Sequence, residues 1–217
     1  MTKQSEADDI IWMVRGHLSD ANSRGWQPAE LFEDNKIRAE EILKAIRQSK
    51  IGWQLSKDQF PKDNYPRPDN YPATDKQSVP QIFSSGFTFL SEESADVVGQ
   101  FDLGDGALYP TRLWRSDRIT PMPGRHFYLN VASKKDAFLP EQSLGAKDIS
   151  HGKWLVPLLP QKDTELWFAD IVLNGPDLWF DPTIIDNFFI SDRLKKALDS
   201  GKLSKDWMLT RCSVAVD

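Results

Sequence analysis

The stretch FFISDRLKKALDSGKL, Phe188 to Leu203, combines three signals of local structure. Its aromatic start is typical of a strand end, Ser191 stands where a helix N-cap is expected, and Asp192 follows in the first helical turn. Leu194 and Leu198 then repeat with the period of a helix. The stretch therefore predicts a strand that leads directly into a capped, amphipathic helix.

The same order of features occurs in TFLSEESADVVGQFDL, Thr88 to Leu103. Phe89-Leu90-Ser91 aligns with Phe189-Ile190-Ser191, and an acidic first turn follows each serine. Upstream, VPQIF resembles GPDLWF. We expect two similar strand–helix–strand units, at residues 80–114 and 175–214. Because few residues are identical, chance resemblance is the alternative.

The remaining chain predicts more strand than helix. Ile10 to Val14 is expected to be a buried strand, with a helix as the alternative. Asn35 is expected to cap a helix that ends near Lys50. The apolar face of this helix would be Ala39, Ile42, Leu43 and Ile46. Further strands are expected in ALYPTRLW, HFYLNVA, KWLVPLL, ELWFADIVL and DWMLTRCSVAV.

For two of these strands the sequence also predicts the position in the sheet. Pro110 would confine its strand to an edge or a bulge. ELWFADIVL, residues 165–173, is apolar on both faces and is expected to be central. Irregularly interspersed helices favour an α+β fold with a mixed, mainly antiparallel sheet and a few short helices. Residues 1–75 and 76–217 are expected to form one compact unit.

Residues 60–80, FPKDNYPRPDNYPATDKQSVP, contain five prolines and predict neither a helix nor a central strand. Such a long loop is often functional, and a surface linker is the alternative. We expect the working surface in non-repeated segments such as this one. The predicted partner-binding residues are Asp63, Tyr65, Asp69 and Tyr71. WRSDRITP, Trp114 to Pro121, predicts either a polar contact patch or a charged turn.

Composition narrows the classes of function. The formal net charge of −5 argues against a general nucleic-acid binder. Cys212 is the only cysteine, which excludes an internal disulfide and a multi-cysteine metal site. The polar start MTKQSEADD does not resemble a leader peptide, and the apolar run that follows is too short to span a bilayer. We expect a cytoplasmic protein with neither nucleic acid nor membrane as its partner.

The residues that most often carry chemistry form no known motif. His17, His126 and His151 lack the spacing of metal ligands, and nucleophile-elbow and phosphate-loop patterns are missing. Asp170 lies in an apolar predicted strand, where capping or pairing explains it. We therefore expect no catalytic residues, cofactor or metal, and a protein that is not an enzyme.

From about Pro80 onward, four motifs in order resemble a bacterial polymorphic-toxin immunity family, the immunity family numbered eleven. They are PQIFSSGFTFLSEESADVV, ALYPTRLW, RHFYLNVASKKDAFLPEQS and DLWFD followed by FFISDRLKKAL. The segment SGKLSKDWMLTRCSV departs from the family pattern in detail, and the first 75 residues carry little resemblance.

The resemblance implies a cytoplasmic protein that binds and neutralises a cognate secreted toxin, such as a contact-dependent or type VI secretion effector. It supplies no functional residues. Two other classes stay open. A small hydrolase acting on glycans or nucleic acids would use His126 or Asp170. A carbohydrate- or peptide-binding module would use exposed Trp and Tyr side chains.

Overall fold

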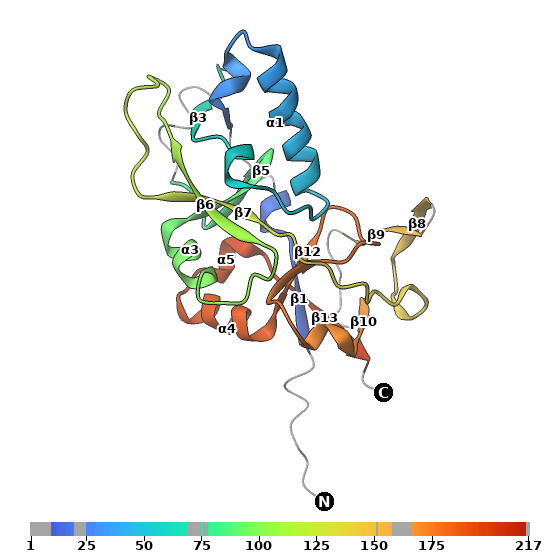
Figure 1. Ribbon diagram of the computed structural model, residues 1–217. Coiled ribbons are helices and arrows are strands. Elements are labelled where there is room, and N and C mark those ends of the chain that lie inside the picture. Colours follow the sequence, from blue (N-terminus) through green and yellow to red (C-terminus); the bar gives the residue numbers. More distant parts are fainter. Residues whose placement is uncertain are drawn as a thin grey trace, which may run out of the picture.

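The computed structural model is an α+β protein built on two large mixed sheets (Figure 1). It describes residues 10–19, 25–68, 75, 78–150, 152–157 and 166–215. The six-stranded sheet consists, in spatial order, of β2 (Trp26–Pro28), β3 (Asp63–Pro66), β6 (Ala107–Leu113), β7 (His126–Asn130), β5 (Phe87–Ser91) and β4 (Ile82–Ser85).

The five-stranded sheet consists, in spatial order, of β10 (Trp167–Ala169), β13 (Thr210–Ala215), β1 (Ile10–Val14), β12 (Phe188–Ser191) and β11 (Leu178–Phe180). A separate hairpin joins β8 (Lys147–Ser150) to β9 (Lys153–Leu155). Each large sheet contains one parallel pair, β3 with β6 and β10 with β13, and its other strand pairs are antiparallel.

The helices are short. The described α-helices are α1 (Lys36–Ser49), α3 (Glu92–Val98), α4 (Asp192–Ser200) and α5 (Ser204–Trp207). The 3-10 turns are η1 (Gly16–Leu18), η2 (Ala29–Phe32), η3 (Lys57–Gln59), η5 (Pro140–Gln142) and η6 (Asp170–Leu173). In the described part of the chain, no helix has the length and apolar character needed to span a bilayer.

The predicted helix caps are confirmed. The amide of Arg38 donates to the side chain of Asn35 at the start of α1. Of the face expected to be buried in α1, Ile42 is buried, whereas Leu43 is 44% exposed. Ser91 and Ser191 cap α3 and α4 in the same way, each accepting a backbone hydrogen bond from the third residue after it.

The two large sheets share one strand order and one register. Phe89 of β5 lies opposite Tyr128 of β7, and Phe189 of β12 lies opposite Met13 of β1. On either side of these pairs the neighbouring strands also match in direction and offset. Strands β4, β5, β7, β6 and β3 thus correspond to β11, β12, β1, β13 and β10, and the N-terminal β1 takes the place that β7 has in the other sheet.

The correspondence extends to the outer edges of the sheets. Pro28 of β2 lies opposite Asn64, and Phe138 lies opposite Phe168 in an isolated antiparallel bridge. The segments that differ are inserted at equivalent places: α1 lies between β2 and β3, and the β8–β9 hairpin lies between Phe138 and β10. Figure 1 shows both insertions away from the paired helices α3 and α4.

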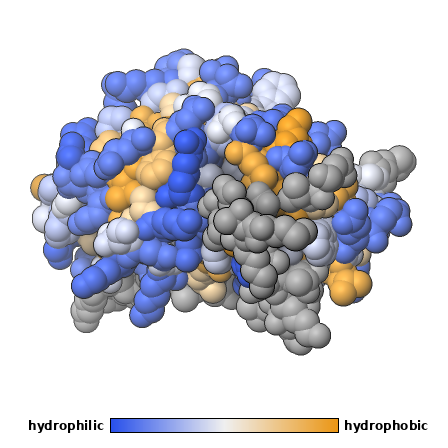
Figure 2. All heavy atoms as spheres, turned by 90° about the horizontal axis from the view of Figure 1, so that it is seen from below, coloured by the Kyte–Doolittle hydropathy of each residue, from blue (hydrophilic) through white to orange (hydrophobic). Residues whose placement is uncertain are grey.

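A core shared by both sheets separates two outer cores. Leu90 and Ile190 belong to the shared cluster of buried residues, which also contains the apolar faces of α3 and α4. Since successive strand residues point to opposite faces, Phe89 and Phe189 lie in the two outer clusters. The cluster around Phe89 includes Ile42 of α1. On the face seen in Figure 2, hydrophobic side chains appear in separate areas among hydrophilic ones.

The prediction that the proline-rich residues 60–80 contain no central strand was wrong for residues 63–66, which form β3 inside the six-stranded sheet. Asn64 explains this outcome, because its buried amide group donates to Thr111 and accepts from the hydroxyl of Tyr128. The edge position predicted from Pro110 was also wrong. Strand β6 lies inside the sheet. Only its residues Arg112 and Leu113 pair with β3, however, so Pro110 has no ladder partner on the β3 side.

The long central strand predicted at residues 165–173 was wrong as well. Only Trp167–Ala169 form a strand, which pairs along its length with β13 alone, and η6 follows at once. Asp170 begins this turn and is exposed to solvent. The last predicted strand is shorter than expected, since residues 204–207 form α5 and β13 starts at Thr210.

Candidate functional site

Side chains from two other segments gather around Tyr65 of β3. The ring of Phe32, at the end of η2, lies 5.9 Å from the Tyr65 ring, and the ring of Trp114 lies 6.5 Å away. The guanidinium of Arg118 lies 4.3 Å from the centre of Phe32 and 5.2 Å from that of Tyr65. Together with Arg112, we call these residues the aromatic–arginine surface.

Asp63 holds one side of this surface in place. Its carboxylate accepts a hydrogen bond of 2.7 Å from Trp114 Nε1 and lies 2.8 Å from Arg112 Nε. The Arg112 guanidinium also lies 5.3 Å from the centre of the Trp114 ring. Because Asp63 and Arg112 are ladder partners on β3 and β6, the parallel pairing itself brings these groups together.

A tight turn after Trp114 positions Arg118. The Asp117 carboxylate accepts hydrogen bonds from the backbone N–H groups of Ile119 and Thr120 and from the Thr120 hydroxyl. These bonds, that of the Thr120 side chain foremost, lower the pKa of Asp117. Arg118 has a φ of 56°, in the left-handed region that short polar turns use. Next to it, the side chain of Ile119 is 79% exposed.

The structure brings together two of the four predicted contact residues. Asp63 and Tyr65 lie side by side on β3, whereas Asp69 and Tyr71 lie outside the described residues. The contribution of Phe32 and Arg112 was missed. Arg112 stands two positions before Trp114, a spacing that places both side chains on one face of a strand. The stretch from Trp114 to Pro121 forms a turn, and its Trp114 and Arg118 side chains join the aromatic–arginine surface.

Such a set of side chains suits protein recognition. Trp, Tyr and Arg carry much of the binding energy at protein interfaces. The Tyr65 ring is tilted by 64° from Phe32 and by 44° from Trp114, so these rings do not form a flat platform. A coplanar row would have favoured the carbohydrate-binding alternative.

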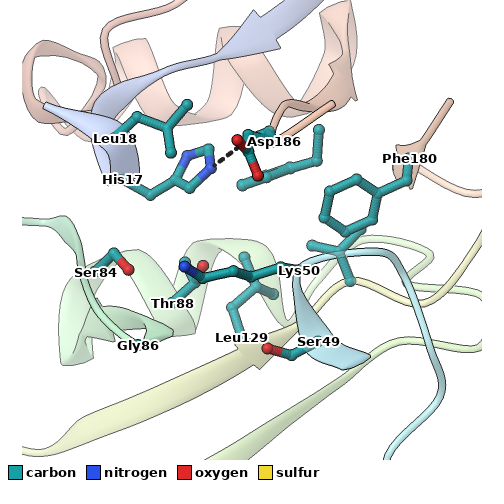
Figure 3. Close-up of a pocket in the computed structure, with 12 residues that line it drawn as sticks. His17, Leu18, Ser49, Lys50, Ser84, Gly86, Thr88, Leu129, Phe180 and Asp186 are labelled. Atoms are coloured by element: carbon teal, nitrogen blue, oxygen red, sulfur yellow. Dashed lines mark hydrogen bonds between the residues drawn. The ribbon is translucent and has the colours of Figure 1, made fainter. Parts of the chain in front are cut away.

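A small cavity lies where the two sheets meet (Figure 3). Its volume is about 110 Å³, below the roughly 300 Å³ at which small-molecule sites begin. His17 and Asp186 line one side, and Ser84 and Thr88 line the opposite side. His17 Nε2 lies 3.1 Å from the carbonyl oxygen of Asp186, which requires Nε2 to donate. The cavity therefore belongs to the junction between the sheets.

His17 is suited to a structural role. Its ring packs 4.9 Å from Phe188, and burial, opposed by the Asp186 bond and assisted by the charge of Lys50, lowers its pKa to about 4. Nδ1 is buried without a hydrogen-bond partner among the described residues. The imidazole is consequently neutral at physiological pH and is held between the sheets.

The residues named for the hydrolase alternative do not converge. His126 is buried on β7 of the six-stranded sheet, and burial lowers its pKa to about 4. Asp170 is exposed beside β10 of the other sheet. His151 lies outside the described residues. Within the described ranges, three or more His, Cys, Asp or Glu side chains are nowhere grouped to hold a metal ion.

Comparison with known proteins adds no further information about this surface. No protein-family model matches the chain, and no curated protein matches it.

Proposed function

We propose that the chain is a cytoplasmic immunity protein that binds a cognate secreted bacterial toxin and blocks it by direct contact. The toxin would be a polymorphic-toxin effector, delivered by contact or by type VI secretion. The proposal assigns no catalytic residue, cofactor or metal, and no nucleic-acid or membrane partner.

The observation that carries the proposal is the aromatic–arginine surface. Asp63 holds the Trp114 indole and the turn at Asp117 positions Arg118, so these two side chains lose little conformational entropy when a partner binds. Ile119 adds an exposed apolar group next to Arg118. The four sequence motifs that resemble the immunity family support the same function, and one of them, ALYPTRLW, contains Arg112 and Trp114 of this surface.

A rescue experiment tests the proposal. The product of the adjacent gene, tested as the candidate toxin, is expressed in a susceptible cell with and without the immunity protein. The wild-type chain should restore growth and co-purify with the toxin domain. The double variant Tyr65→Ala, Arg118→Ala should fold normally but bind roughly a thousandfold more weakly, since each hot-spot side chain contributes about 2 kcal/mol.

A matched variant controls for nonspecific loss. Ile171→Ala removes an exposed apolar side chain, 58% exposed, that lies next to the other sheet. It should bind like the wild type. If the wild-type chain neither protects the cell nor binds the neighbouring product, the proposed function is wrong. If it protects and the double variant protects equally, a different surface is used.

A further inference from the structure

A groove adjoins the aromatic–arginine surface and shares Asp63 with it. It lies between η2 and η3 on one side and β3 and β6 on the other, with a volume of about 620 Å³. Phe60 and Tyr109 provide apolar lining, and the Tyr109 hydroxyl is fixed by a 2.9 Å hydrogen bond to the carbonyl of Leu55. The groove therefore has a formed wall and enough space for a long side chain.

One carboxylate in this groove lacks a full set of partners. Glu30 lines the groove, its side chain is only 19% exposed, and its Oε2 is buried without a hydrogen-bond partner among the described residues. A buried acceptor without a donor costs free energy, more so when it is charged. Within the described ranges, the second oxygen of this carboxylate can therefore still accept a hydrogen bond.

The cations of the groove do not supply that donor. Arg38 lies 3.8 Å from the other carboxylate oxygen of Glu30, and its guanidinium already donates to Glu41 at 3.1 Å and to the carbonyl of Asp58 at 3.2 Å. Two further cations, Lys57 and Lys62, are exposed at the groove lining and form no ion pair with Glu30.

We propose that this groove receives an arginine side chain of the toxin, with Glu30 as the residue that pairs with it. A guanidinium presents planar N–H donors that match a carboxylate, and it packs well against an aromatic wall such as Tyr109. The net charge of −5 favours a basic partner. This inference rests on the proposed function for the identity of the partner, and on the groove alone for its chemistry.

The test uses a small probe in place of the toxin. ¹⁵N-labelled protein is titrated with Nα-acetyl-L-arginine N-methylamide, and amide shifts are followed by NMR. Saturable shifts should appear at groove residues, with weaker binding of the matching lysine derivative. Glu30→Gln should raise the dissociation constant roughly tenfold or more, because a charged hydrogen bond is lost. Glu33→Gln, the same change at an exposed acid of the same groove, should stay within about twofold.

A stability measurement separates recognition from a structural role. Since Glu30 Oε2 has no hydrogen-bond partner in the described part of the chain, Glu30→Gln should leave Tm unchanged or raise it. A lower Tm would identify Glu30 as a structural partner of Arg38 and overturn the proposal. Absence of saturable shifts in the wild type, or equal weakening in both variants, would also overturn it. The probe contains no toxin, so these outcomes are independent of the rescue experiment.

Discussion

The indole Nε1 of Trp12 donates a hydrogen bond of 2.9 Å to the carboxylate of Asp192, although 180 positions separate the two residues. Trp12 lies on β1, between β12 and β13, and Asp192 begins α4. At the start of the same strand, Ile10 lies opposite Ser213 of β13. The two ends of the described chain therefore meet in adjacent strands.

This arrangement predicts that a circular permutant folds. In this permutant, residue 217 is joined to residue 1, and the new chain ends lie between residues 19 and 25. Ladder partners lie only about 5 Å apart, and permutation is tolerated where chain ends lie close together. We expect the wild-type far-UV circular dichroism spectrum and a single cooperative urea transition.

The control permutant is opened between Phe127 and Tyr128, inside the internal strand β7. It should lose cooperative unfolding, because its new termini interrupt a ladder with neighbours on both sides. If both permutants fail in the same way, β1 does not complete the five-stranded sheet as described.

The two N-cap serines should contribute similarly to stability. Ser191→Ala and Ser91→Ala should each lower the free energy of unfolding by about 1–2 kcal/mol, since a helix N–H loses its acceptor. Ser200→Ala, at the exposed end of α4, should change it by less than about 0.5 kcal/mol. Urea denaturation of the three variants checks this order, and a loss at Ser200 as large as at Ser191 would contradict it.

The two buried histidines predict a loss of stability in mild acid. Burial lowers the pKa of both His17 and His126 to about 4, below the ordinary value of 6.5. The unfolded chain therefore binds more protons than the folded chain between these values. Stability is complete above pH 6.5 and falls as the pH drops towards 4, by about 2 kcal/mol for each histidine between pH 7 and pH 5.

Urea unfolding at pH 7 and pH 5 measures this loss. Glu92 and Glu93 face His126 and partly oppose the effect, whereas Lys50 adds to it at His17. His17→Gln and His126→Gln should each remove about half of the difference between the two pH values. An unchanged difference in either variant would show that the histidine concerned does not titrate in this range.

Asp63 should couple more strongly to Trp114 than to Arg112. Its bond to the half-buried indole is shielded, whereas the Arg112 side chain is 61% exposed. Double-mutant cycles with Asp63→Ala should give about 0.2–1 kcal/mol for the Arg112→Ala pair. The cycle with Trp114→Phe should give about 1.5–3 kcal/mol, the range of hydrogen bonds to charged groups. The reverse order would mean that the ion pair, rather than the indole, fixes the surface.

Local signals were sufficient where a structure depends on neighbouring residues. Asn35, Ser91 and Ser191 were identified as caps because a cap bonds a backbone group three positions ahead. The strand at Ile10 to Val14 was recognisable as a continuous apolar run. The α+β class followed from the irregular order of such elements.

Distant partners decided the elements that were predicted wrongly. Strand β3 exists because Asn64 is bound by Thr111 and Tyr128, far along the chain. Strand β10 ends at Ala169, where η6 begins, and its Phe168 lies opposite Phe138 of a distant segment. Neither interaction leaves a trace in local propensity or periodicity.

The candidate surface was predictable in part for the same reason. Asp63 and Tyr65 were named from the composition of their own segment. The stacking of Arg118 on Phe32 joins a turn to a segment many positions earlier, and only the folded sheet brings them together. The groove residue Glu30 carried no signal at all in the sequence, since a single acid in a polar segment is ordinary.

The place of β1 also determines when the protein can be completed during synthesis. This strand leaves the ribosome early, but its neighbours β12 and β13 are translated near the end of the chain. The six-stranded sheet lies within residues 26–130 and can assemble on the nascent chain, whereas the five-stranded sheet must wait until residue 215 has emerged. Until then the apolar face of β1 has no lasting partner, so slow translation or premature termination would expose it to chaperones.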